Sequence, residues 1–190
     1  MSQIELILDH NRIFVEKKKY EKFLTSKFPE KKMVILTCMD TRLVELLPSA
    51  MNLKNGDVKI IKNAGAIVSH PFGSVMRSII VAIYELGAAE VLVVGHHDCG
   101  MMGLNSTNLL GKAIKRGISN HTITTLGHAG VDLPKWLTGF TSPQEGIAKS
   151  VGIIKNHPLL PSDIIVHGLI IHPETGKLDL VVNGLMETEE

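Results

Sequence analysis

Short apolar runs recur along the chain and alternate with segments of helical spacing. A run that is apolar at consecutive positions is typical of a buried strand, whereas apolar residues three or four positions apart indicate one face of a helix. On this basis we predict five strands, at residues 33–37, 58–61, 91–94, 164–171 and 178–182. Helices are predicted between them, at residues 43–53, 72–86, 107–116 and 143–156.

Strands that alternate with helices predict an α/β fold, with a mainly parallel sheet of about five strands and helices on both faces. The last two predicted strands are separated by a short stretch, residues 173–176, whose sequence Pro-Glu-Thr-Gly has the composition of a tight turn. No crossover helix fits into that stretch. We therefore expect the last strand to be an antiparallel edge strand, paired in a hairpin with the strand before it.

We interpret the chain as a single domain, residues 1–190, in which residues 1–30 form an N-terminal helical arm. Residues 4–24 carry apolar side chains among charged ones, which predicts one or two amphipathic helices. Residues 119–142 contain scattered Gly, Thr and Pro, so we predict a loop with short helical turns there.

Composition and charge exclude several classes of protein. The apolar share is 44%, which is enough to bury a core, and the net charge is only +1, which gives no electrostatic reason to expect a nucleic-acid partner. No apolar run reaches the roughly 18 residues that a membrane helix needs, and Asp9 and Arg12 interrupt any apolar segment of a signal peptide. We therefore expect a cytoplasmic protein without nucleic-acid or membrane partners.

Two segments of reactive side chains each follow directly after a predicted strand. Cys38 directly follows the first strand and precedes Asp40 and Arg42, while His96 and Cys99 follow the third strand. In open parallel sheets ligands collect beyond the carboxyl ends of the strands, so neighbouring strands would bring these residues together. Two thiolates and one imidazole suit Zn²⁺, and three protein ligands leave a fourth position open, which is typical of a catalytic zinc site.

Asp40 and Arg42 are candidate catalytic residues beside this metal site. The planar guanidinium of Arg42 can hold a carboxylate through two hydrogen bonds. An aspartate held in this way keeps its charge and points one oxygen in a fixed direction, so Asp40 could accept a hydrogen bond from the attacking water. The alternative for Asp40 and Arg42 is an ion pair with a structural role only.

The sequence resembles the β-carbonic anhydrases, and in particular their compact bacterial and archaeal members. The elements that match are CMDTR at residues 38–42, KNAGAIV at 62–68 and GHHDCGM at 95–101. The resemblance implies zinc held by Cys38, His96 and Cys99, and reversible hydration of CO2 to bicarbonate and a proton. It also implies a homodimer, often paired into a tetramer, and an inactive state in which Asp40 becomes the fourth zinc ligand.

The KNAGAIV element contributes Asn63, Ala64 and Gly65 as the predicted wall of the substrate pocket, although the same residues could also serve as a tight turn after a strand. Three positions depart from the family pattern, namely Lys62, Thr41 and His97. We expect these changes to affect fine tuning more than zinc binding. His97 is interpreted as a packed or supporting residue, because neighbouring residues seldom point the same way.

Three other functions stay open at this stage. One is a zinc hydrolase of carbonyl sulfide or carbon disulfide on the same fold, since these molecules are linear triatomic analogues of CO2. Another is a non-catalytic zinc-binding or regulatory module. The last is thiol redox chemistry, in which Cys38 and Cys99 form a disulfide instead of binding a metal.

Overall fold

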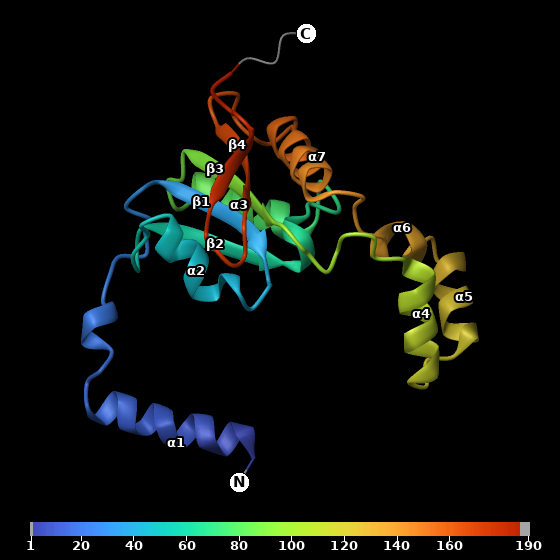
Figure 1. The fold of residues 1–190 in the computed structure, drawn as a ribbon, viewed down its shortest axis with the longest axis horizontal. Coiled ribbons are helices and arrows are strands. Elements are labelled where there is room, and N and C mark those ends of the chain that lie inside the picture. The colour runs from blue at the N-terminus through green and yellow to red at the C-terminus, as the bar shows by residue number, and fades with distance from the viewer. Residues whose placement is uncertain (1, 187–190) are drawn as a thin grey trace.

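A five-stranded sheet lies at the centre of the protein in the computed structural model, which describes residues 2–186 (Figure 1). Its spatial order is β2-β1-β3-β4-β5. The strands are β1 (Met33–Cys38), β2 (Val58–Asn63), β3 (Glu90–His96), β4 (Ile165–Ile171) and β5 (Leu178–Val182). The first four pair in parallel and β5 pairs antiparallel with β4, which confirms the predicted sheet and its edge strand.

The order of the strands reverses beside β1, because β2 lies on one side of β1 and β3 on the other. The register pairs Thr37 of β1 with Val94 of β3, so the carboxyl ends of these two strands reach the same edge of the sheet. Such a reversal point is where α/β sheets bind their ligands. The fold therefore places the ends of β1 and β3 at the expected position for a site.

Helices cover both faces of the sheet, as predicted. They are α2 (Leu43–Ala50) on one face, and α3 (Ser74–Tyr84) and α7 (Pro143–Lys155) on the other (Figure 1). Alternate residues of β1 pack against the helices on the two faces of the sheet, because successive side chains of a strand point in opposite directions. Leu36 belongs to the core cluster with Ile154 of α7, whereas Ile35 belongs to the cluster with Leu47 of α2.

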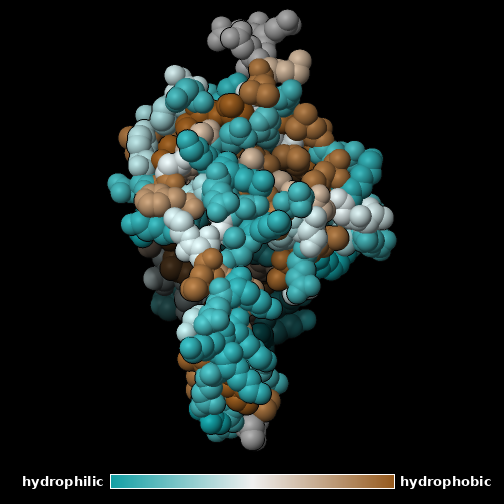
Figure 2. Space-filling view, turned by 90° about the vertical axis from the view of Figure 1, so that its left-hand side faces the viewer, coloured by the Kyte–Doolittle hydropathy of each residue, from teal (hydrophilic) through white to brown (hydrophobic). Residues whose placement is uncertain are grey.

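The N-terminal arm begins with α1 (Gln3–Glu16), followed by a short 3-10 turn (Glu21–Phe23). Helix α1 starts at a capping box in which Ser2 and Glu5 each accept a hydrogen bond from the other's backbone N–H. None of its residues is buried, and it stands away from the sheet (Figure 1). In Figure 2 the arm projects below the body, where apolar surface interrupts the polar surface.

A helical lobe, residues 104–139, projects from the other side of the body (Figure 1). It contains α4 (Ser106–Lys115), α5 (Asn120–His128) and α6 (Leu133–Leu137). The predicted loop is therefore wrong for residues 120–128. Thr and Gly are poor helix formers, but the Ser119 hydroxyl accepts a hydrogen bond from the Thr122 N–H and caps α5.

Within residues 2–186, none of the helices combines the length and the apolar character needed to cross a membrane.

Candidate metal centre

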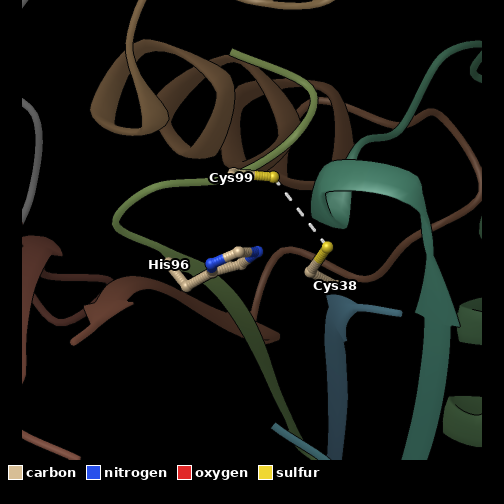
Figure 3. Close-up of side chains that lie close together, drawn as sticks. All are labelled: Cys38, His96 and Cys99. Carbon is tan, nitrogen blue, oxygen red and sulfur yellow. Dashed lines mark hydrogen bonds between the residues drawn. The ribbon is translucent and has the colours of Figure 1, made fainter. Parts of the chain in front are cut away.

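The three predicted metal ligands meet at the sheet edge where the strand order reverses (Figure 3). Cys38 is the last residue of β1, His96 is the last residue of β3, and Cys99 follows three positions later in the loop after β3. The ligand atoms of these three residues all lie within 4.8 Å of one another. All three side chains are buried, with at most 5% of their surface exposed.

The spacing of the two sulfur atoms suits a tetrahedral zinc ion. The Cys38 and Cys99 Sγ atoms are 3.9 Å apart. Two sulfurs bound to one zinc at about 2.3 Å in a tetrahedral arrangement are separated by roughly 3.8 Å. The measured distance therefore leaves the correct gap for the ion without any rearrangement of β1 or of the loop after β3.

The imidazole of His96 is oriented as a metal ligand. Its Nδ1 lies 2.8 Å from the backbone carbonyl oxygen of His97, to which it donates a hydrogen bond. This fixes the proton on Nδ1 and leaves a lone pair on Nε2, the pattern that supports metal-binding histidines. Nε2 is buried, and among the described residues it has no hydrogen-bond partner. A buried polar atom without a partner is costly, and a metal ion would satisfy it.

The two cysteines differ in how readily they ionise. Burial raises the pKa of Cys38, but His96 and the backbone N–H groups of Gly65 and Asp40 favour its thiolate and together lower the pKa below the usual value. Burial raises the pKa of Cys99, and the neighbouring Cys38 raises it further. The site by itself therefore favours one thiolate, and a bound cation is required for both sulfurs to ionise.

Asp40 and Arg42 lie at the solvent side of the ligands, in the loop that joins β1 to α2. The Arg42 Nε and Nη2 atoms donate to the two carboxylate oxygens of Asp40 at 3.0 and 2.8 Å. The Arg42 backbone N–H also donates to Asp40 Oδ1 at 2.9 Å. Aspartate commonly forms such a turn, in which its side chain accepts from the backbone N–H two residues later. The Arg42 side chain is the main reason that the pKa of Asp40 falls to about 2.

The Asp40 carboxylate also points towards the ligand set. Its Oδ2 atom lies 3.7 Å from Nε2 of His96, and with the imidazole neutral and its proton on Nδ1, both atoms are hydrogen-bond acceptors. Two acceptors cannot bond to each other, so their approach favours a cation or a donor between them. Asp40 is thus close enough to influence the fourth position of the metal while Arg42 holds it by two oxygens.

A pocket of about 630 Å³ opens beside Cys38 and Cys99. Of the predicted wall residues, Ala64 and Gly65 line it. The Asn63 side chain instead bonds to the backbone N–H and carbonyl of Ile67 and stabilises the turn after β2. Asn63 therefore stabilises the pocket wall indirectly, by holding the turn that carries Ala64 and Gly65.

Sequence reasoning missed two parts of this site. Met101 forms part of the pocket wall, and Asp98 makes an ion pair with Arg42, with 3.0 Å between its Oδ2 and Nη1. Both follow a predicted metal ligand closely in the sequence, which is the one signal that could have suggested them. His97 is a supporting residue, because its carbonyl holds His96 and its ring packs near His172.

Comparisons with known proteins agree with this geometry. The model of the carbonic anhydrase family matches residues 33–178. A Bacillus subtilis (strain 168) protein named "Putative carbonic anhydrase YvdA" is 65% identical over 189 residues, which cover 100% of this chain and 95% of that protein. The crystal structure of a β-carbonic anhydrase, isoform I, from Trichomonas vaginalis superimposes with a TM-score of 0.88 at 38% identity, covering 97% of this chain and all of the other.

More distant relatives include enzymes named for another substrate. A carbon disulfide hydrolase from Acidianus sp. (strain A1-3) is 29% identical over 160 residues, which cover 78% of this chain and 76% of that enzyme. Relatives of this chain are thus named both as carbonic anhydrases and as carbon disulfide hydrolases.

Proposed function

This chain belongs to the β-carbonic anhydrase family, and we propose that it catalyses the zinc-dependent, reversible hydration of CO2 to bicarbonate and a proton. One observation carries this proposal. The Nε2 atom of His96, buried and without a partner among the described residues, faces two cysteine sulfurs spaced for zinc, beside a carboxylate that an arginine holds. Zinc, when bound, acidifies a water molecule and so supplies a nucleophile near neutral pH.

In this proposal each side chain has a separate task. Cys38, His96 and Cys99 hold the metal and leave one position open to the pocket. Asp40 accepts a hydrogen bond from the attacking water and so orients it towards the substrate. Arg42 holds Asp40 by both oxygens, which keeps the carboxylate from becoming a fourth ligand and closing the site.

The pocket provides a mainly apolar space for a small uncharged substrate. Ala64 and Gly65 offer no large side chain, and Met101, which lies directly against Gly65, adds an apolar side chain to the wall. CO2 has no net charge and needs no ionic partner, so such walls are sufficient to admit it. Bicarbonate is an anion, and the Arg42 guanidinium at the mouth is the positive charge that it would meet on leaving.

Stopped-flow CO2 hydration by the zinc-replete protein across pH tests the proposed function directly. We expect turnover that rises with pH as the nucleophile ionises, and near-stoichiometric zinc by elemental analysis. Zinc at full occupancy without CO2 turnover would instead favour a non-catalytic zinc-binding module. A protein that contains no zinc and cycles between thiol and disulfide would favour redox chemistry.

Hydrolysis of carbon disulfide or carbonyl sulfide is the second candidate. It is favoured by the likeness to carbon disulfide hydrolases and by the apolar pocket walls, which would accept a sulfur analogue as readily as CO2. Parallel assays with each substrate, on the same zinc-replete sample, decide between them. The substrate with the higher kcat/KM is the one for which the pocket is adapted.

We also propose that the protein forms a homodimer or tetramer in the cytoplasm. The assembly is supported by α1, a complete helix with no buried residue and several exposed apolar side chains. A second copy of the chain is the partner that would cover it. The location is supported by the cysteines, because thiols that serve as metal ligands must stay reduced.

A further inference from the structure

Arg42 has a second anionic partner besides Asp40. Its Nη1 atom lies 3.0 Å from Oδ2 of Asp98, and its Nη2 atom donates to the backbone carbonyl oxygen of Asp98 at 3.1 Å. Asp98 is 56 positions away in the sequence and belongs to the loop after β3, which follows His96 and carries Cys99. The guanidinium therefore connects the loop of one zinc ligand with the loop of the other two.

The hydrogen bonds of Arg42 are divided between the two aspartates. Asp40 takes Nε and one bond of Nη2, whereas Asp98 takes Nη1 and a second bond of Nη2. If the Arg42 guanidinium were bonded to Asp40 alone, it could still rotate about the side-chain bonds of Arg42. Contacts on the far edge of the guanidinium remove that freedom, because the group is planar and its five donors have a fixed arrangement.

The backbone of Asp98 is shaped to make both contacts. Its φ angle is +55°, in the left-handed region that aspartate and asparagine tolerate better than most other residues except glycine. This conformation turns the chain between His96 and Cys99 so that the Asp98 carbonyl and carboxylate both reach Arg42. The Asp98 side chain is 83% exposed, so it has no packing role that would otherwise explain its position.

We propose that Asp98 is a positioning residue, which holds the Arg42 guanidinium in the orientation that keeps Asp40 away from the metal. The proposal rests on the proposed function, since it assigns Asp98 a task in the same site. The groups around Arg42 are Asp40 and Asp98, with His96 3.7 Å behind Asp40. Without the Asp98 side chain, Nη1 of Arg42 loses its acceptor and Asp40 is held less firmly.

Two substitutions separate the side-chain acceptor of Asp98 from its backbone shape. Asp98→Gly removes the carboxylate and keeps the left-handed conformation and the carbonyl. Asp98→Asn keeps an acceptor oxygen for Nη1 in the same backbone conformation, so it is the conservative variant that should rescue the function. Asp179→Asn is the matched control, because Asp179 is an exposed aspartate paired with Lys177 at 2.9 Å, outside the site.

The experiment measures kcat and KM for CO2 hydration with the zinc enzyme, and the visible absorption spectrum of each variant after substitution with Co²⁺. We expect Asp98→Gly to lower kcat about tenfold, the lower end of the loss seen when an outer partner of a metal site is removed. KM should change little and zinc content should stay full. The cobalt spectrum should move towards that of Arg42→Ala, in which Asp40 is released, whereas Asp98→Asn and Asp179→Asn should resemble the wild type.

A wild-type cobalt spectrum and wild-type kcat in Asp98→Gly would overturn the proposal. Equal losses in Asp98→Gly and Asp98→Asn, with a wild-type cobalt spectrum in both, would also overturn it, because the effect would then not act through Asp40. If the wild-type protein does not hydrate CO2, the proposed function fails. The cobalt spectra then decide the role of Asp98 on their own, since they do not depend on turnover.

Discussion

The Sγ atoms of Cys38 and Cys99 lie 3.9 Å apart, although 61 positions separate the two residues in the chain. A disulfide would require about 2.05 Å, and both cysteines are free. The distance instead suits two sulfurs that share one zinc ion. Because Nε2 of His96 faces the same gap, the arrangement favours a metal site over a redox pair.

Replacing either cysteine by serine should remove zinc and activity together. Cys38→Ser and Cys99→Ser each replace a thiolate by a hydroxyl that zinc binds poorly when it is protonated. The measurement is elemental analysis of purified protein beside CO2 hydration by the same sample. Full zinc content in both variants would exclude these cysteines as ligands.

Arg42→Ala should separate metal content from turnover. Without the guanidinium, Asp40 loses its two side-chain hydrogen bonds and is free to take the open metal position. We expect full zinc content and loss of most CO2 hydration. Lys177→Ala, which removes an exposed cation from a surface ion pair, is the control and should behave as the wild type. Near-normal turnover of Arg42→Ala with zinc bound would leave Asp40 and Arg42 as a structural ion pair.

Asp40→Asn should also retain zinc and lose activity, but the activity is lost for a different reason. The amide keeps the size of the carboxylate, but it cannot accept a proton or orient water in the same way. We expect kcat to fall roughly 10²- to 10⁴-fold, the usual contribution of a positioned acid or base. A kcat within threefold of the wild type (about 0.7 kcal/mol) at unchanged zinc content would contradict the role assigned to Asp40.

The sequence was informative where local pattern determines structure. The apolar run from Val34 to Leu36 forms a buried strand, and the parallel order puts Cys38 beside His96, as the positions of both residues after strands predicted. A residue at the carboxyl end of a strand is located by the strand itself. The meeting of Cys38, His96 and Cys99 could therefore be inferred from the sequence.

Contacts that depend on backbone conformation in loops could not be inferred in this way. The ion pair between Asp98 and Arg42 requires a φ of +55° at Asp98, and no spacing rule predicts that angle at a non-glycine residue. Asn63 belongs to a matching motif, yet its side chain turns towards Ile67 because the backbone there offers both a donor and an acceptor. Helix α5 was missed because a serine cap outweighs its poor composition.

The pKa of Asp40 provides a test of its pairing with Arg42. The Arg42 side chain lowers this pKa to about 2, from an ordinary value of about 3.9. Because the folded-state pKa is lowered, the stabilisation from the pair is fully present above about pH 4 and is lost as the pH falls through about 2. A ¹³C NMR titration of the Asp40 carboxyl in zinc-free protein should show this midpoint, and in Arg42→Ala the midpoint should return towards about 4. A wild-type midpoint near 4 would contradict the pairing.

Gly65→Ala should disturb the pocket wall and the thiolate together. Gly65 has a φ of +84°, and an added Cβ would come within 2.9 Å of Cγ of Met101. The backbone strain alone costs about 1–2 kcal/mol. Movement of Gly65 would also weaken the hydrogen bond that its N–H donates to Cys38 Sγ, in which the nitrogen and sulfur are 3.4 Å apart. Urea denaturation and zinc affinity should both show the loss. Gly111→Ala, in helix α4 with open space around it, is the control and should gain about 0.5–1 kcal/mol.

The last prediction concerns the N-terminal arm and the proposed assembly. Ile4 and Leu8 lie on one face of α1, one turn apart, and are 59% and 61% exposed, while Glu16 lies on the charged face. If a second copy covers the apolar face, Ile4→Lys with Leu8→Lys should shift the mass measured by light scattering from dimer or tetramer towards monomer at micromolar concentration. The zinc site should remain loaded, because α1 has no buried residue within its own chain. Glu16→Lys introduces a lysine on the charged face and should leave the mass unchanged. A monomeric wild type, or a double variant with wild-type mass, would show that α1 does not hold the assembly together.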